Sequence, residues 1–164
     1  MFGLARRAMF GGRAVTLGRT IGRCRMPCKY VVVHEGRMIV EQWVGTIGYA
    51  ELVDHKTRQR ADPAVKAPAS VLSDCTLADV EISPEAIDRL SDLEPDQRGQ
   101  AAVQRYAFLV KPEVYQRAQR FADRVSAIGT TVRMFNNRDA ACRWLDLDPA
   151  EVRALIASFG IPGS

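Results

Sequence analysis

The sequence predicts an α/β fold, in which a mixed sheet of four to five strands opens with a hairpin and has helices packed on it. Two observations predict this class. Two β-forming runs near residue 35 are separated only by a short turn that contains glycine, which is a hairpin pattern. After them, short apolar runs alternate with helical segments, an order typical of a mainly parallel sheet covered by helices. The 164 residues correspond to about one domain.

The hairpin consists of YVVVH, from Tyr30 to His34, and MIVEQWV, from Met38 to Val44. Both runs are rich in β-branched residues, which favour strands. From Tyr49 onward the apolar period changes to that of a helix, which we expect to end near Asp62 because Pro63 follows. The residues predicted on the inward face of this helix are Tyr49, Leu52, Val53 and Lys56.

The middle of the chain adds a strand, a helix and another strand. Ala69 to Thr76 is a short strand candidate, and an acidic loop follows it. Ser83 then opens a helix with a proline in its first turn. Tyr106 to Val110 is a continuous apolar run, as expected of a strand that is covered on both faces.

The last third contains the clearest helix. Its apolar residues recur at helical spacing, its arginines form a solvated face, and Gly129 closes it. Residues 130–135 are a strand candidate, and Asn136 or Asn137 can cap the helix that carries Trp144. DPAE at 148–151 then starts a final helix. The apolar positions of the clearest helix are Val114, Ala118, Phe121, Ala122 and Val125.

We divide the chain into a basic leader (1–28), a domain (29–147), and a C-terminal helix and tail (148–164), and charge sets the leader apart. Residues 1–25 contain six arginines and no acid, which leaves 17 basic against 19 acidic residues in the remainder. The high pI therefore reflects the leader and does not predict a nucleic-acid-binding fold. We expect no nucleic-acid partner for the domain and, since apolar runs are short, no transmembrane segment.

Three interpretations of the leader stay open. It is a disordered tail or a mis-annotated start upstream of Met26, a transit peptide for organellar import, or a nucleic-acid-binding arm. Four cysteines in a chain of this length predict no disulfide framework. With only two histidines, far apart in sequence, we expect no metal and no cofactor. A reducing compartment, the cytoplasm, is the simpler prediction.

Several segments resemble the bacterial STAS/SEC14-like family, also called SpoIIAA-like. They are the opening hairpin, LADVEISPEAI, and VRMFNNRDAACRWL, and the resemblance covers about residues 28–146. It implies a SpoIIAA/STAS-like domain that is non-catalytic and regulatory through protein–protein binding, with a homodimer as one arrangement. SEC14-like relatives instead imply a carrier or sensor of a small apolar ligand or lipid. A third hypothesis is an enzyme without a recognisable motif.

Ser83 is the regulatory candidate, because relatives place a phosphorylated serine at a helix N-terminus. Their pattern is Asp-Ser-Ser/Thr-Gly, whereas Glu81-Ile82-Ser83-Pro84 lacks the second hydroxyl residue and the glycine. A serine before Pro-Glu is also a helix N-cap, which contributes about 1 kcal/mol to stability. The sequence favours the cap.

The ligand-pocket candidates are Trp43, Tyr49, Phe108 and Phe121, which we weigh against an ordinary aromatic core. No catalytic residue is predicted. His55 is expected to be an exposed histidine on a charged helix face, and adjacent helical residues such as Asp54 do not form a dyad with it. A cavity between sheet and helices would favour the carrier, and a solid core would favour the docking module. A cleft that gathers His34, His55 and carboxylates would favour the enzyme.

Overall fold

The computed structural model describes residues 27–93 and 103–161. Within these ranges, five strands form a single sheet in the order β1-β2-β3-β4-β5. The first pair is antiparallel and the other three pairs are parallel, which confirms the predicted mixed sheet with its opening hairpin. The strands are β1 (Cys28–Val33), β2 (Met38–Ile47), β3 (Ala69–Val80), β4 (Val103–Leu109) and β5 (Thr131–Phe135).

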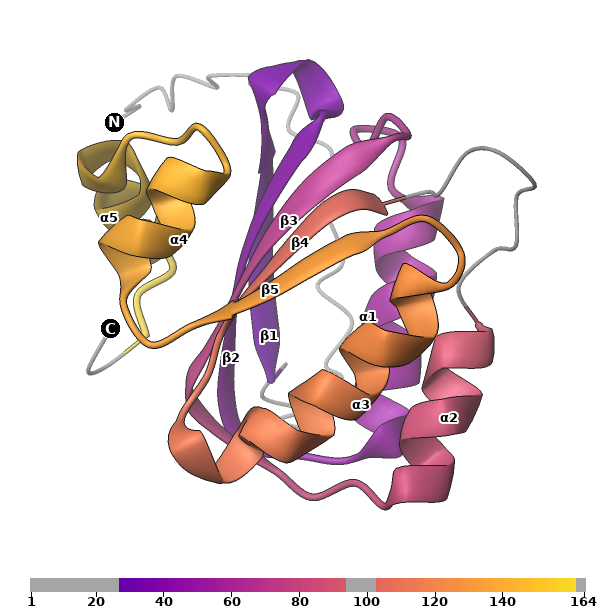
Figure 1. Ribbon diagram of the computed structural model, residues 1–164. Helices are drawn as coiled ribbons and strands as arrows, with labels where there is room; N and C mark the ends of the chain where they lie inside the picture. Colours follow the sequence, from indigo (N-terminus) through magenta and orange to yellow (C-terminus); the bar gives the residue numbers. More distant parts are fainter. Residues whose placement is uncertain (1–26, 94–102, 162–164) are drawn as a thin grey trace, which may run out of the picture.

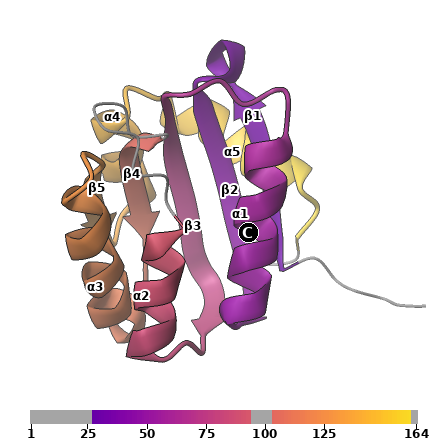
Figure 2. The ribbon, with the colours of Figure 1, turned by 90° about the vertical axis from the view of Figure 1, so that its right-hand side faces the viewer.

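Helices cover both faces of the sheet. α1, α2 and α3 lie on one side, and α4 and α5 lie on the other (Figures 1 and 2). Two short 3-10 turns, η1 (His34–Gly36) and η2 (Pro112–Val114), precede β2 and α3. The helices are α1 (Tyr49–Ala61), α2 (Pro84–Asp92), α3 (Tyr115–Ser126), α4 (Arg138–Trp144) and α5 (Pro149–Ser158).

Because side chains alternate along a strand, β2 contributes to both faces. Val40 packs with α4 and α5 in an aliphatic cluster that includes Leu145 and Ile156. Trp43 packs on the opposite side, in a cluster that contains Ala118 of α3. The sheet is therefore the shared wall of two separate cores.

β3 is longer than the sequence predicted. The segment that begins at Leu77, predicted as an acidic loop, continues the strand as far as Val80. After a register shift beyond Gln42, its residues pair in parallel with Val44 to Ile47 of β2. These backbone hydrogen bonds explain the difference, since they come from a strand distant in sequence.

Residues 1–26 lie outside the described residues, so the three interpretations of the leader stay predictions. None of the helices in the described part of the chain combines the length and apolar character that crossing a bilayer requires.

Candidate functional site

A cavity lies between the sheet and helices α1, α2 and α3. Its volume is about 90 Å³, which exceeds the space that a single water molecule takes up in the liquid, about 30 Å³. Its walls are largely aliphatic and aromatic, with residues from β2, β3 and β4 and from all three helices. An apolar hollow with few polar groups is the usual form of a small-molecule site.

Three of the four predicted pocket residues line this cavity. They are Trp43, Phe108 and Phe121, and Tyr106 joins them. The rings of Tyr106 and Phe108 are stacked with their centroids 4.3 Å apart. The fourth, Tyr49, is not a lining residue, and its ring lies against the guanidinium of Arg89, 4.8 Å away.

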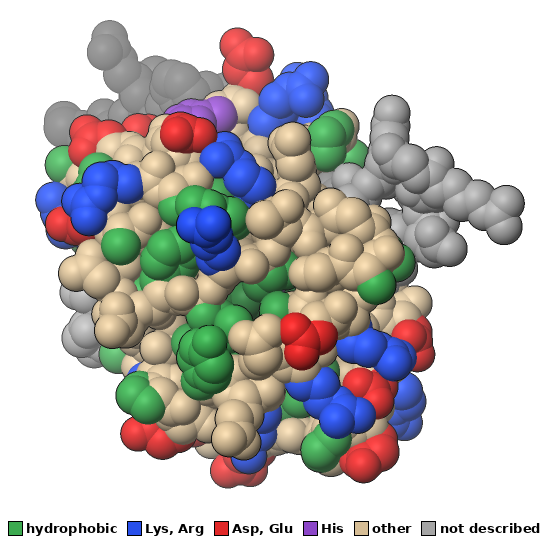
Figure 3. Space-filling view, in the orientation of Figure 1, with side chains coloured by type: hydrophobic (Ala, Val, Ile, Leu, Met, Phe, Trp, Pro, Cys, Tyr) green, Lys and Arg blue, Asp and Glu red, His purple; other side chains and the backbone are tan. Residues whose placement is uncertain are grey.

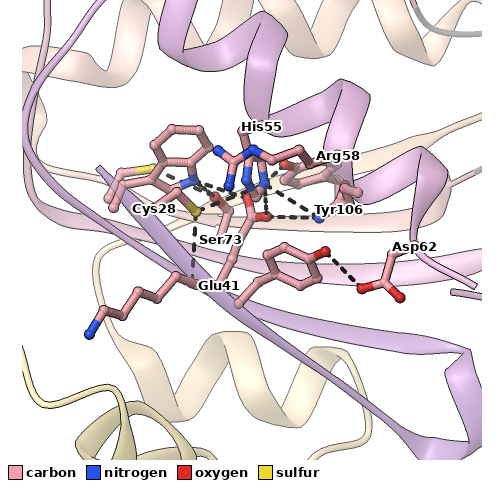
Figure 4. Close-up of polar contacts among 12 residues, drawn as sticks. Cys28, Glu41, His55, Arg58, Asp62, Ser73 and Tyr106 are labelled. Atoms are coloured by element: carbon pink, nitrogen blue, oxygen red, sulfur yellow. Dashed lines mark hydrogen bonds and ion pairs between the residues drawn. The ribbon is translucent and has the colours of Figure 1, made fainter. Parts of the chain in front are cut away.

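A network of hydrogen bonds centred on Glu41 adjoins the cavity (Figure 4). Glu41 lies in β2 with no exposed surface. One carboxylate oxygen, Oε1, accepts from the Trp43 indole at 3.1 Å and from the Tyr106 hydroxyl at 3.0 Å. The other, Oε2, lies 2.8 Å from Nε2 of His55 and accepts from the Gln59 amide at 3.0 Å. This single carboxylate therefore contacts three side chains of the cavity wall.

The charge of Glu41 is compensated inside the protein. Burial alone raises the pKa of this carboxyl. The electrostatic attraction of His55 and the hydrogen bonds from His55, Ser73 and Trp43 outweigh burial and lower the pKa to about 2. Glu41 is therefore ionised at neutral pH and cannot donate a proton there. Both of its carboxylate oxygens have hydrogen-bond partners.

The prediction that His55 is exposed is wrong, because its exposed fraction is 2%. Helix α1 buries His55, Lys56 and Gln59. With Leu52, which lines the cavity, these residues follow the spacing i, i+3, i+4 and i+7 of one helix face. These polar residues at helical spacing were the signal in the sequence, and Glu41 on the facing strand contacts two of them, His55 and Gln59. His34 is exposed in η1, apart from this network as far as the described side chains show.

Cys28, Glu41 and His55 bring three possible metal-ligand atoms within 4.8 Å of one another. Zinc accepts thiolate, imidazole and carboxylate ligands, but a structural site uses four. Here the 2.8 Å from His55 Nε2 to Glu41 is a hydrogen-bond distance, and Gln59 binds the same oxygen. The geometry therefore fits a proton between the two groups better than a metal ion.

The same three residues do not form a nucleophilic triad. Cys28 Sγ lies 3.8 Å from His55 Nε2, the nitrogen that Glu41 already contacts. In a triad the nucleophile and the acid bind different ring nitrogens. Burial also raises the pKa of the Cys28 thiol well above its usual value, so this cysteine is protonated and a poor nucleophile.

A surface groove lies between the beginnings of α2 and α3. Its lining includes Ser83, Tyr115 and Arg120. Ser83 Oγ accepts a hydrogen bond from the backbone N–H of Ala86 at 3.2 Å, which is N-cap geometry. The groove and the cavity share three residues, so they adjoin. These shared residues are Ile82, Ile87 and Arg117.

The surface near this groove carries charges of both signs. Lys or Arg side chains alternate with Asp or Glu where α2 and α3 lie in this view, and hydrophobic side chains gather nearer its middle (Figure 3). Arg120 binds Asp88 at 2.6 Å, and Arg124 binds Asp92 at 2.9 Å. Such exposed pairs contribute about 0–1 kcal/mol each, and they join α2 to α3.

Comparison with solved structures finds an uncharacterized protein from the DUF3478 family with a SpoIIAA-like fold, from Shewanella loihica PV-4. It is 18% identical to this chain, and the match covers 72% of this chain and 91% of that chain with a TM-score of 0.48. This likeness concerns the fold alone. No family model matches the sequence, and the search of curated proteins gives no match.

Proposed function

We propose that this domain binds a small apolar molecule in the cavity, as a carrier or sensor and without a chemical step. The observation that carries the proposal is the cavity itself, which lies between sheet and helices and is walled by Trp43, Phe108 and Phe121. A fully packed interior would leave voids little larger than one water molecule. Retaining a larger apolar hollow costs stability, so a binding role is its natural explanation.

The Glu41 network supports this role because it fixes part of the cavity wall. Trp43, His55 and Tyr106 each contact the Glu41 carboxylate and also line the cavity. Side chains held in this way lose little further freedom when a ligand arrives. Preorganisation of this kind improves affinity by reducing the entropy cost of binding.

The alternative of a protein-docking module receives less support from the described surface. Its exposed large hydrophobic residues are Leu93 and Tyr115, whereas docking sites usually present a contiguous apolar patch. Protein binding and a homodimer therefore stay predictions. Catalysis is not part of the proposal, since His55 Nε2 is engaged by Glu41 and its Nδ1 is buried without a hydrogen-bond partner among the described residues.

Fluorescence of Trp43 tests the proposal directly. In a Trp144→Phe variant the emission reports Trp43 alone, because the chain contains two tryptophans. Titration with 1-hexanol, a small and mainly apolar probe, is expected to change this emission in a saturable way. Binding to the native state also raises Tm as the ligand concentration rises.

A cavity-filling variant provides the control. Ala118 lines the cavity from α3, so Ala118→Leu is expected to abolish the saturable change. Ala154 is exposed on α5, and Ala154→Leu makes the same substitution there and should leave binding intact. A saturable response that survives Ala118→Leu, or no response in any protein, would contradict the proposal.

A further inference from the structure

Small and aromatic side chains alternate across the sheet where it forms the cavity wall. β3, the middle strand of the sheet, contributes the small side chains of Ser73, Cys75 and Ala78, whereas Trp43 comes from β2 and Phe108 from β4. β2 and β4 pair with opposite edges of β3, so they lie about 10 Å apart, twice the spacing of neighbouring strands. The sheet under the cavity therefore forms a trough, with small residues on its floor and an aromatic ring on each side.

Contacts with Ser73 hold the two sides of this trough in place. The indole N–H of Trp43 lies 3.1 Å from Ser73 Oγ and 3.1 Å from the Glu41 carboxylate, and it donates to both. Ser73 in turn pairs with Phe108 in the parallel ladder of β3 and β4. Trp43 and Phe108 also pack in the same core cluster. The floor residue Ser73 thus lies between the two rings.

Two further rings enlarge the side of the trough that Phe108 begins. The Tyr106 ring stacks on Phe108, with 4.3 Å between centroids and 18° between planes. Phe121 of α3 stands nearly perpendicular to both, 5.9 Å from Phe108 and 6.3 Å from Tyr106, and all three rings line the cavity. Stacked and edge-to-face pairs are the arrangements in which aromatic rings attract one another, so a further ring can join this aromatic cluster in either way.

α2 gives the cavity an aliphatic side instead. Its contribution to the lining includes Ile87 and Leu90, and Ile82 lines the cavity just before the helix begins. Aliphatic side chains attract any apolar group through burial and dispersion, with little dependence on orientation. Selectivity for one class of apolar ligand is therefore expected from the aromatic side of the cavity and not from α2.

We infer that the ligand is a small aromatic molecule, whose ring lies in the trough between Trp43 and the aromatic cluster of Phe108. This inference rests on the proposed function and names the class of ligand. Contact between aromatic rings strengthens binding beyond the effect of the buried area, by about 2- to 10-fold in affinity. Because Glu41 already fixes Trp43 and Tyr106, these contacts require little further ordering when the ligand binds.

Three neutral alcohols with seven carbons test the inference: benzyl alcohol, cyclohexylmethanol and 1-heptanol. Of these, benzyl alcohol alone contains an aromatic ring. In the Trp144→Phe protein, titrations followed by Trp43 emission should show benzyl alcohol binding about 2- to 10-fold more tightly than either saturated alcohol. Transfer from water alone predicts the opposite order, since the saturated alcohols have the larger apolar surface. This comparison needs no change in the cavity wall.

Phe121→Leu then removes one ring of the cluster and keeps an apolar side chain. It should reduce the preference for benzyl alcohol over cyclohexylmethanol by about two-fold or more, and its binding of cyclohexylmethanol shows that the variant is folded. Ile87→Val is the matched control, because it shortens the aliphatic side of the cavity and should leave the ratio of the two affinities unchanged. If Phe121→Leu fails to fold, Phe108→Leu makes the same replacement on β4.

The possible failures are distinguishable. If cyclohexylmethanol or 1-heptanol binds as tightly as benzyl alcohol, the aromatic inference is overturned and the proposed function stands. If the preference for benzyl alcohol is unchanged in the folded Phe→Leu variant, the aromatic cluster does not recognise the ring and the inference fails. If none of the three alcohols binds, both the inference and the proposed function are overturned.

Discussion

The two faces of the sheet are formed by the same strands but are filled in opposite ways. Under α4 and α5, aliphatic side chains such as Val40, Leu145 and Ile156 pack into a closed cluster. Under α1, α2 and α3, the sheet presents Glu41 and its partners beside a cavity. The first face carries an aliphatic cluster, and the other combines an apolar hollow with an ordered polar network.

The difference shows how sharply a strand can separate two environments. Glu41 and Gln42 are consecutive in β2, and neither has any exposed surface. Glu41 is surrounded by donors, whereas the side-chain nitrogen and oxygen of Gln42 have no hydrogen-bond partner among the described residues. Their side chains point to opposite faces because the strand period is two.

The largest expected effect comes from breaking the network. Glu41→Leu removes the buried carboxylate that contacts His55, Tyr106 and Gln59. We expect this to lower the free energy of unfolding by about 3–5 kcal/mol, the usual cost of removing one partner of a buried ionic group. Urea denaturation with an unchanged m-value measures the loss.

Gln42→Leu is the matched control on the other face. It replaces a buried amide that lacks partners by an apolar side chain of similar size. The free energy of unfolding should stay the same or rise by up to about 2 kcal/mol. Equal losses for Glu41→Leu and Gln42→Leu would show that the two faces do not differ in the way described.

A second pair of variants compares the packing of the two faces. Ala141 of α4 is fully buried in the aliphatic cluster, so Ala141→Leu should cost about 1–3 kcal/mol through overpacking. Ala118→Leu places the same side chain in the cavity. It should leave the free energy of unfolding unchanged or raise it by up to about 1 kcal/mol. Thermal unfolding of both variants distinguishes them, and a comparable loss in both would mean that the cavity is not open space.

The smallest effects are expected at the helix caps, where the two faces should be equivalent. Ser83 caps α2 and Asn137 caps α4 through hydrogen bonds of 3.2 and 2.9 Å. Ser83→Ala and Asn137→Ala should each lower the free energy of unfolding by about 1 kcal/mol. If Ser83→Ala alone changed 1-hexanol binding in the Trp43 assay, Ser83 would have a role beyond capping. Its phosphorylation stays a hypothesis.

The sheet could be predicted from sequence because its signals are local. The hairpin turn lies between two β-rich runs, and the helices carry apolar stripes and caps, so each element is specified by residues close together in the chain. The aromatic residues Trp43, Phe108 and Phe121 were identified as pocket candidates in the same way. Whether they enclose space or fill it depends on how side-chain volumes add up across the fold, which spacing does not reveal.

The Glu41 network could not be predicted from the sequence, because its members lie on β2, β4 and α1 and become neighbours only in the folded protein. In a strand covered on both faces, MIVEQWV does not show which side Glu41 takes. On α1, the apolar spacing placed Tyr49 and Val53 on the inward face, whereas the face that turns inward carries His55 and Gln59. The buried carboxylate decides between them, since it satisfies donors that would otherwise be costly to bury.

The order of strands in the sheet is the same as their order in the chain, and this bears on how the protein is made. During synthesis, residues nearer the N-terminus leave the ribosome first. Every residue of the Glu41 network, up to Tyr106, leaves the ribosome before α5 does. The polar face can therefore assemble first, and the aliphatic face stays uncovered until Val152 and Ile156 arrive. Until then, the aliphatic face exposes apolar surface of the kind that makes incompletely folded chains prone to aggregation.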